Sequence, residues 1–440
     1  MIIILTRGQA MLQKMLLIFL SLGCVGLFAD GVQPAGSGTE ADPYQVATLD
    51  NLLWVSTTDS SWTSHFIQTA NIYAAYTQNW NDGEGFSPIG VDLNSFHGNY
   101  DGQNHTIASL YINRPLLKVQ GLFGKIYSAT IENLGLTTVD VTGYSMVGGL
   151  VGICSHSTVN NCYSVGCMCG TGDCTGGLVG RNSFTTVSNC YSAGNVSGGE
   201  DTSGLVGWNV YSTISNCYST GSVSGTGNNT GGLAGWNYDS TINNCYSTGS
   251  VNGAGDYTGG LIGRNFGNST VSDSFWDMET SGQATSAAGT GLTTAEMQTP
   301  ATFTDAGWDF VGETANGTDD YWDIDGINND GYPYLSWQDF VGIDEDIFPE
   351  PETALQAAFP NPFNPTTTIK FSVQAGELAT LEIFNLRGQL VKLYPVFRAG
   401  KHEVIWDGAD NTGNCVASGV YFYRLQSDTA LRVRKMLLLK

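Results

Sequence analysis

Residues 230–253 read TGGLAGWNYDSTINNCYSTGSVNG, and close copies of this stretch lie immediately before and after it. Each copy consists of three short β-prone runs separated by Gly, Ser, Asn and Thr turn residues. A single copy cannot bury its own apolar residues, so the copies must stack like on like. We therefore predict an all-β fold, a parallel β-solenoid (β-helix) whose coils of about 28 residues rise about 4.8 Å each. The leucine of the repeated GLxG element marks these coils at Leu122, Leu150, Leu178, Leu205, Leu233 and Leu261.

Stacking places equivalent residues of successive coils above one another, so we expect inward ladders of identical side chains. One slot holds a cysteine in four coils, Leu134 one coil earlier and Ser274 one coil later. A slot that accepts Leu, Cys and Ser is a small buried site, so we interpret these cysteines as packing residues. Disulfides between adjacent coils fit in-register parallel strands poorly, and no CxxC or His pairing supports zinc. The four residues are Cys162, Cys190, Cys217 and Cys245.

The first 29 residues predict a signal peptide. An apolar run follows the basic Lys14, and Ala29 provides a small residue for cleavage. A lipoprotein signal at Cys24 is the alternative, although Ser21 stands where an aliphatic residue is wanted. A retained anchor would need a longer apolar run. We expect export into surroundings where disulfides can form.

Cysteines that occur in only one coil form a separate group. In an exported protein we consider a disulfide between Cys169 and Cys174, across the loop that joins them, with unpaired thiols as the alternative. The other members of the group are Cys154 and Cys167.

Charge divides the chain into two parts. The net charge is −23, with 5 Lys+Arg against 34 Asp+Glu in residues 30–352 and 10 against 6 in residues 353–440. The acidic part would repel a phosphate backbone, so we exclude nucleic acid as a partner. Two differently charged parts indicate two separate units.

Strand alternation sends two rows of side chains outward from the solenoid. These rows either stack on themselves and shield the solenoid, or form a strip that binds sugar rings or a partner surface. The tentative ligand-binding residues are Tyr163, Tyr191, Tyr218 and Tyr246 in one row, and Arg181, Trp208, Trp236 and Arg264 in the other.

The segments around the repeats predict caps, because open solenoid ends would pair with other chains. We expect the Ile107 and Leu110 positions to anticipate Ile131 and Leu134 in a shorter coil. The predicted organisation is a signal peptide (1–29), an N-terminal cap with irregular coils (30–120), the solenoid (121–280), a C-terminal cap (281–342), an acidic linker (343–358) and a terminal domain (359–440).

The strings GTEADPYQVATLDNL, YDGQNHTI, GGLVG and NNDGYPYLSW resemble the GLUG-motif repeats of secreted bacterial proteins over residues 36–340. Relatives of this kind include surface adhesins and the accessory region of some IgA-cleaving metalloproteases. Protease activity does not carry over, since the nearest string to HExxH is HEVIW at His402, which lacks the second His.

The last 82 residues have alternating strand patterns that predict a small immunoglobulin-like β-sandwich. The strings FPNPFNPTTTIKFSV, EIFNLRGQLV, WDGADNTGNCVASGVYFYRL and KMLLLK resemble the C-terminal sorting domain of the type IX (Por) secretion system. The resemblance implies recognition by the outer-membrane export machinery, surface attachment and removal of this domain.

Five scattered histidines fall in no catalytic or metal-binding spacing, and we assign no catalytic residue and no metal ligand. A looser calcium site in DDYWDIDGINNDG is the weak exception to a prediction of no cofactor, because neither register fits an EF-hand. A polysaccharide lyase or hydrolase that uses outward carboxylates is the alternative function. Its candidates are Asp101, Asp239, Asp256, Asp273 and Asp277.

The sequence as a whole predicts an exported bacterial protein, secreted or on the outer membrane or cell surface. We expect a non-catalytic role in adhesion or in binding a glycan or another surface ligand, and the terminal domain is expected to direct export.

Overall fold

The computed structural model describes residues 31–338 except 92, and residues 353–439 except 357, 359, 374–377, 395, 399, 415, 428 and 429. The predicted signal peptide, Cys24 and most of the acidic linker lie outside these ranges. The chain divides into two compact units, one ending at Gln338 and the other starting at Asp339.

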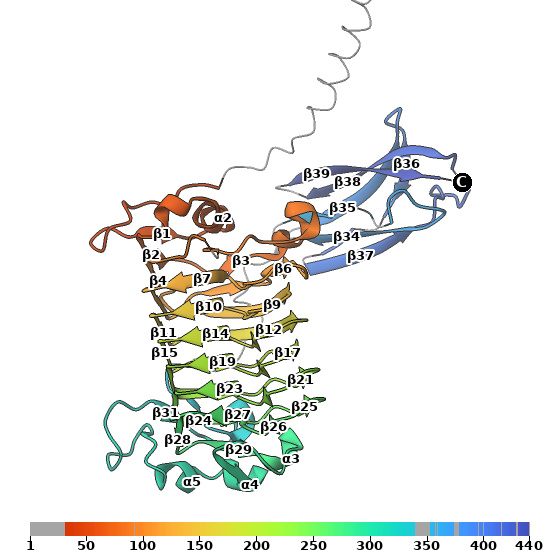
Figure 1. The fold of residues 1–440 in the computed structure, drawn as a ribbon. Helices are drawn as coiled ribbons and strands as arrows, with labels where there is room; N and C mark the ends of the chain where they lie inside the picture. The colour runs from red at the N-terminus through yellow and green to blue at the C-terminus, as the bar shows by residue number, and fades with distance from the viewer. Residues whose placement is uncertain are drawn as a thin grey trace, which may run out of the picture. The chain divides into compact units, whose positions relative to one another are not determined.

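The first unit is a parallel β-solenoid, as the repeat predicted. One of its faces is a six-stranded parallel sheet in which each strand comes from the next coil (Figure 1). Its register follows the repeat, since Val151 pairs with Val179 and Val179 pairs with Val206. The six strands are β7 (Phe123–Tyr127), β10 (Val151–Ser155), β14 (Val179–Ser183), β19 (Val206–Val210), β23 (Ala234–Tyr238) and β27 (Ile262–Phe266).

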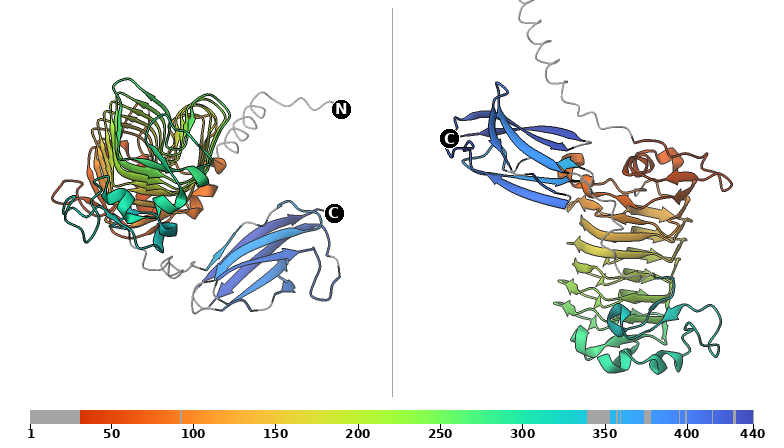
Figure 2. Two further views of the ribbon diagram at one scale, coloured as in Figure 1. Left: turned by 90° about the horizontal axis from the view of Figure 1, so that it is seen from below. Right: turned by 180° about the vertical axis from the view of Figure 1, so that it is seen from behind.

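The other walls of the solenoid belong to one continuous parallel sheet, and its coils superpose when the unit is seen along its axis (Figure 2). The second wall contains β1 (Tyr44–Val46), β2 (His65–Gln68), β4 (Asn99–Asp101), β8 (Thr130–Glu132), β11 (Thr158–Asn160), β15 (Thr186–Ser188), β20 (Thr213–Ser219), β24 (Thr241–Ser247) and β28 (Thr270–Ser272).

The remaining strands continue these walls around each coil. Ten of them form the third wall, and a short four-stranded sheet lines the Gly-rich corner. The former are β3 (Ile72–Tyr73), β5 (Thr106–Ala108), β6 (Tyr111–Asn113), β9 (Gly135–Gly143), β12 (Tyr163–Gly170), β16 (Tyr191–Ser192), β17 (Asn195–Gly198), β21 (Val223–Gly225), β25 (Val251–Gly253) and β29 (Phe275–Asp277). The latter are β13 (Thr175–Gly176), β18 (Thr202–Ser203), β22 (Thr230–Gly231) and β26 (Thr258–Gly259).

The core consists of the predicted inward ladders. All six repeat leucines are fully buried, and so are the four ladder cysteines, which are free thiols. Burial raises the pKa of the Cys162, Cys190 and Cys217 thiols well above the ordinary value, so these thiols stay protonated and inert. The interpretation of the cysteines as packing residues is confirmed.

A buried asparagine ladder runs behind the six-stranded sheet. The Asn182 side-chain amide donates to Asn209 (2.9 Å), Asn209 donates to Asn237 (2.9 Å), and Asn237 donates to Asn265 (2.8 Å). Because each inner member both donates and accepts, polar side chains can be buried here at little cost. Cys154 occupies the equivalent position above Asn182.

The N-terminal end of the solenoid is closed by helix α2 (Leu49–Thr57), which buries Leu52 and Val55. Short 3-10 turns follow at η1 (Asp59–Ser61), η2 (Ala75–Asn79) and η3 (Asn81–Gly83). The predicted register of the first coils is wrong. The structure pairs Tyr100 with Ile131 and Ile107 with Leu136, so the early coils do not repeat the later spacing.

The C-terminal cap covers the last coil and folds back along the second wall. Its elements are α3 (Met278–Ser281), β30 (Thr290–Leu292), α4 (Thr294–Met297), α5 (Pro300–Thr304), β31 (Trp322–Asp323), η4 (Asn328–Gly331) and β32 (Tyr334–Leu335).

The second unit is a small antiparallel β-sandwich. Its two sheets are β33-β34-β37 and β36-β35-β38-β39, and they enclose one core that includes the buried Trp406. Tyr423 fixes the start of this unit, because its hydroxyl donates to the Gln356 carbonyl and accepts from the Ala358 N–H, both at 2.8 Å. The strands are β33 (Ala354–Leu355), β34 (Thr367–Val373), β35 (Ala379–Asn385), β36 (Leu390–Leu393), β37 (Gly400–Trp406), β38 (Gly419–Ser427) and β39 (Leu431–Leu438).

Candidate binding surface

The predicted tyrosine row leaves the second wall in the expected direction, but the C-terminal cap covers part of it. Tyr218 is 2% exposed and Tyr246 is fully buried. The Tyr218 hydroxyl donates to Gln338 (2.9 Å), and the Tyr246 hydroxyl donates to the Pro333 carbonyl. These two tyrosines seal the cap against the solenoid, so their expected role in ligand binding is wrong.

Tyr163 and Tyr191 lie higher in the same row and are only partly buried. The two rings stack at 4.8 Å, and each also contacts Trp337 of the cap, at 6.2 and 6.1 Å. Tyr191 stacks in turn on Tyr218 at 4.9 Å. Their ring faces are therefore occupied by neighbouring rings.

The predicted Trp and Arg row forms one column on the outer face of the six-stranded sheet. The rings of Trp208 and Trp236 stack at 5.1 Å with 9° between their planes. The Arg181 guanidinium lies 4.4 Å from the Trp208 ring centroid, and Arg264 lies 5.2 Å from that of Trp236. Each indole is thus covered by the other indole and by an arginine. The structure thus shows the first alternative, a row that stacks on itself. The ring faces that a sugar would stack on are covered, and the ring edges remain accessible.

The indole nitrogens of this column do not offer hydrogen bonds to a ligand either. The Nε1 atoms of Trp208 and Trp236 are buried and lack a hydrogen-bond partner among the described residues. The Nε atom of Arg181 is buried and unpaired in the same way. Unpaired buried donors cost stability. The free hydrogen-bonding capacity of this column therefore lies in the outer nitrogens of the two guanidinium groups.

A second set of aromatic residues, which the sequence reasoning missed, lines the corner between the six-stranded sheet and the second wall. Neighbouring rings are separated by 5.2, 4.9, 5.0, 5.7 and 5.9 Å in chain order. All except Tyr238 are exposed. We call this set the aromatic corner; it consists of Tyr127, His156, Phe184, Tyr211, Tyr238 and Phe266.

The corner itself is built by a hydroxyl residue in each coil. The Ser212 hydroxyl donates to the Val210 carbonyl two residues earlier (2.8 Å) and accepts from the Thr185 N–H of the preceding coil (3.0 Å). Such local hydroxyl bonds favour a turn. The residue before the hydroxyl adopts the left-handed conformation and projects outward.

This left-handed position holds large aromatic side chains in the middle coils. His156, Phe184 and Tyr211 have φ values of 49°, 53° and 49°. Bulky residues are rare in this region, because the Cβ atom crowds the backbone at a cost of about 1–2 kcal/mol per residue. Asp239 and Gly267 occupy the same position in later coils, so the turn does not require an aromatic residue. Aligning the residue that precedes each Ser-Thr or Thr-Thr dipeptide of the repeat would have revealed the aromatic residues of this corner.

Cys169 and Cys174 do not form the predicted disulfide, since all eight described cysteines are free. Cys169 is half-buried in β12, whereas Cys174 is buried in the turn that follows. The Cys174 thiol instead donates to Asp201 at 3.9 Å.

Three of the five candidate catalytic carboxylates have structural hydrogen bonds. Asp101 accepts from the Gln103 N–H (2.9 Å), and Asp239 accepts from the Asn268 N–H (2.7 Å). Asp277 caps α3 and accepts from Tyr332 (2.6 Å). Burial opposes ionisation of Asp277, but its hydrogen bonds outweigh burial and lower its pKa.

The acidic turn considered for calcium is also internally bonded. Asp325 accepts from the N–H groups of Ile327 and Asn328 at 2.8 Å, and Tyr334 donates to Asp323 at 2.9 Å. Across the described ranges, no three His, Cys, Asp or Glu side chains lie close enough together to hold a metal ion. Within the same residues, no helix is both long enough and apolar enough to cross a membrane.

The fold defines a repeat protein, a capped parallel β-solenoid followed by a small sandwich. Residues 171–197, 204–224 and 226–252 match the family model of the GLUG motif, and residues 357–439 match that of the secretion system C-terminal sorting domain. The chain therefore contains GLUG motifs and a type IX sorting domain, as the sequence resemblance indicated. This domain marks proteins that the type IX machinery exports to the cell surface or secretes.

Two curated relatives match parts of the chain. Halomucin from Haloquadratum walsbyi is 36% identical over 141 residues, which are 31% of this chain and 2% of Halomucin. A proposed Gly-rich membrane protein from Evansella cellulosilytica is 42% identical over 69 residues, 16% of this chain and 7% of that protein. The chain thus spans only a small fraction of these relatives.

A crystal structure of a proposed immunoglobulin A1 protease from Bacteroides ovatus has a similar fold. The alignment has a TM-score of 0.50 and 18% identity, and it covers 69% of this chain and 95% of the other. At this identity the likeness concerns the fold alone.

Proposed function

We propose that this exported protein is a non-catalytic surface protein that binds an extracellular ligand, and thereby serves adhesion, through the outer face of the six-stranded sheet and the aromatic corner. The sorting domain supports delivery to the cell surface, where such a ligand would be met.

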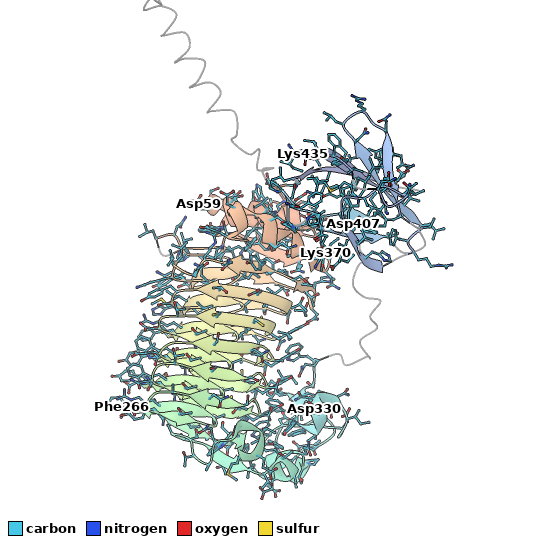
Figure 3. The ribbon with its side chains drawn as sticks, turned by 90° about the vertical axis from the view of Figure 1, so that its right-hand side faces the viewer. Asp59, Phe266, Asp330, Lys370, Asp407 and Lys435 are labelled. Atoms are coloured by element: carbon cyan, nitrogen blue, oxygen red, sulfur yellow. The ribbon has the colours of Figure 1, made fainter. Side chains whose placement is uncertain are left out.

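The observation that carries this proposal is the aromatic corner. Phe184 is 53% exposed, Tyr211 48% and Phe266 54%. Figure 3 places Phe266 at the edge of the solenoid, with its side chain pointing away from the ribbon. A contiguous row of exposed aromatic side chains is typical of an interaction surface.

Stability alone does not account for these residues. Stacking returns about 0.5–1.5 kcal/mol per aromatic pair, which is of the same size as the cost of the left-handed backbone. Ser128 occupies the same corner position with φ of 50°, as Asp239 and Gly267 do in later coils. The fold can therefore form its corner without an aromatic residue, and a binding role supplies a reason for three successive coils to carry one at this position.

The test is binding of the full chain to cells and to an array of extracellular polysaccharides. We expect Phe184→Ser combined with Tyr211→Ser to abolish binding, since serine is native to this corner at Ser128 and should preserve the turn. The matched control is Tyr76→Ser, which removes an aromatic side chain that is 53% exposed but lies outside the corner.

Unchanged thermal unfolding of the double variant would separate lost binding from lost folding. Binding that survives the double variant, or that falls equally with Tyr76→Ser, contradicts the proposed surface. A folded wild-type protein that binds neither cells nor any polysaccharide contradicts the proposed function.

A further inference from the structure

The cations of the solenoid are not distributed over its surface. Residues 31–338 contain 5 Lys+Arg and 27 Asp+Glu. Three of the five cations, Lys125, Arg181 and Arg264, occupy the same outward column of the six-stranded sheet, in register with Ile153, Trp208 and Trp236. An acidic domain thus retains most of its positive charge on one face.

The remaining two cations lie elsewhere on the solenoid. Arg114 forms an ion pair with Glu84 at 3.2 Å, and the Lys118 amine lies 6.0 Å from the ring of Tyr144. The described ion pairs do not include Arg181 or Arg264. The two arginines on the sheet face therefore form no ion pair with a described carboxylate.

Aromatic rings orient these guanidinium groups. Arg264 lies 5.0 Å from the Tyr257 ring centroid and 5.3 Å from that of Phe266, in addition to its contact with Trp236. A guanidinium held against rings keeps its planar N–H edge in a fixed orientation, which suits two-pronged binding of a carboxylate or sulfate. The contact with Phe266 also joins the cation column to the aromatic corner.

The rings that stack on one another in this surface present their edges rather than their faces. His156 and Phe184 stack at 4.9 Å with 1° between their planes, as Trp208 and Trp236 do at 5.1 Å. The edge of an aromatic ring carries the positive part of its quadrupole. Ring edges and guanidinium groups together favour a ligand rich in negatively charged oxygen atoms.

The column extends over six coils, which corresponds to about 24 Å at the spacing of parallel strands. Arg181 and Arg264 are three coils apart, and Lys125 lies two coils beyond Arg181. A small anion could contact only one of these cations, whereas an extended polymer with repeated charges could contact all three.

We propose that the ligand of this face is an anionic polysaccharide, which lies along the column of Lys125, Arg181 and Arg264 beside the aromatic corner; this rests on the proposed function. Charge complementarity selects this occupant from the surface ligands that the proposed function allows. Carboxylates farther than about 8 Å from the column interfere little with binding, because charges beyond that distance are largely screened at physiological ionic strength. Asp239, the carboxylate at the corner, accepts hydrogen bonds from Asn268.

The experiment measures binding of the full chain to polygalacturonate and to neutral dextran of similar length, at low and at physiological salt. We expect binding to polygalacturonate that weakens as salt rises, and little binding to dextran. Arg181→Gln combined with Arg264→Gln should weaken binding by about tenfold or more, because two charge-assisted contacts are lost.

The matched control combines Lys118→Gln with Arg387→Gln, which removes the same charge from other places and should change affinity less than about twofold. Equal binding to dextran, or equal losses in the two double variants, overturns the anionic ligand while leaving the proposed function in place. If the protein binds cells through Phe184 and Tyr211 but does not bind polygalacturonate, the anionic ligand is likewise overturned and the proposed function stays in place. Failure of the folded protein to bind cells or any polymer overturns both proposals.

Discussion

Replacement of Asn209 by Leu tests whether the buried asparagine ladder stabilises the solenoid through its continuity. Asn209 is fully buried, accepts from Asn182 and donates to Asn237. Leucine would leave the Asn182 amide N–H and the Asn237 carbonyl oxygen without these partners. Each unpaired buried group costs about 1–3 kcal/mol, so two cost about 2–6 kcal/mol. Burial of the leucine returns about 1–2 kcal/mol, and we expect a net loss of about 1–4 kcal/mol.

Asn182→Leu is the matched control, because Asn182 is equally buried but lies at the end of the ladder. Its carbonyl oxygen already lacks a partner, so leucine removes one unpaired group while creating another at Asn209. These two effects nearly cancel, and we expect a change within about 1 kcal/mol.

Urea unfolding followed by tryptophan fluorescence measures both variants. Nine of the ten tryptophans precede residue 339, so the emission reports the solenoid and its caps. The midpoint of unfolding should fall for Asn209→Leu with little change in slope. Equal losses in the two variants, or no loss in Asn209→Leu, would refute the reasoning that continuity of the ladder matters.

Three further predictions concern the cysteine slot, a buried carboxylate and the cap. Cys217→Ala should cost about 1–3 kcal/mol, because the Cys190 N–H loses its acceptor. Cys217→Ser should cost less than about 1 kcal/mol, since Ser274 accepts from the Cys245 N–H in the same way. Urea unfolding midpoints compare the two variants, and equal losses of stability would contradict the role of Cys217 as an acceptor. Burial raises the pKa of Asp201 to about 6, so the folded state binds the proton more tightly than the unfolded state and stability should fall as pH rises from about 4 to 6. Asp201→Asn, which copies Asn229 of the next coil, should abolish this fall in thermal scans; an unchanged pH profile would count against it. Trp308→Ala should remove contacts with Phe303 and Trp322 and a hydrogen bond to the Asp273 carbonyl. Limited proteolysis should then cut the C-terminal cap before the solenoid. A cap as resistant to proteolysis as in the wild type would disprove that the cap depends on Trp308.

The sequence predicted the parts of the fold that depend on the repeat period. The spacing of the leucines and cysteines was sufficient to place them in columns, because each coil pairs with the next in register. The same logic failed for Ile107, where the chain lacks the regular period and the pairing shifts to Leu136. Stacking constrains residues only where the repeat continues.

The burial of the tyrosine row could not be predicted from the repeat. Tyr218 and its partner Gln338 are separated by 120 residues, and the local sequence contains no indication that the cap returns over this wall. The outward direction followed from strand alternation, whereas exposure depended on a distant segment. A similar limit applied to Cys169 and Cys174, whose closeness in sequence did not reveal that the Cys174 thiol donates to Asp201 of the next coil instead.

The stacking of aromatic rings, in contrast, follows from the repeat and decides how such a surface can bind. Identical aromatic residues in register lie about 4.8 Å apart, which is the distance between parallel strands and leaves room only for stacked rings. The observed separations of 4.8–5.1 Å in the tyrosine and tryptophan rows agree with this constraint. An uninterrupted aromatic row on a solenoid therefore loses the ring faces on which a sugar would stack. The parts of such a row that a ligand can still contact are the ring edges and any charged residue at the ends of the row. On this protein, Arg181 and Arg264 lie at the two ends of the stacked tryptophan pair.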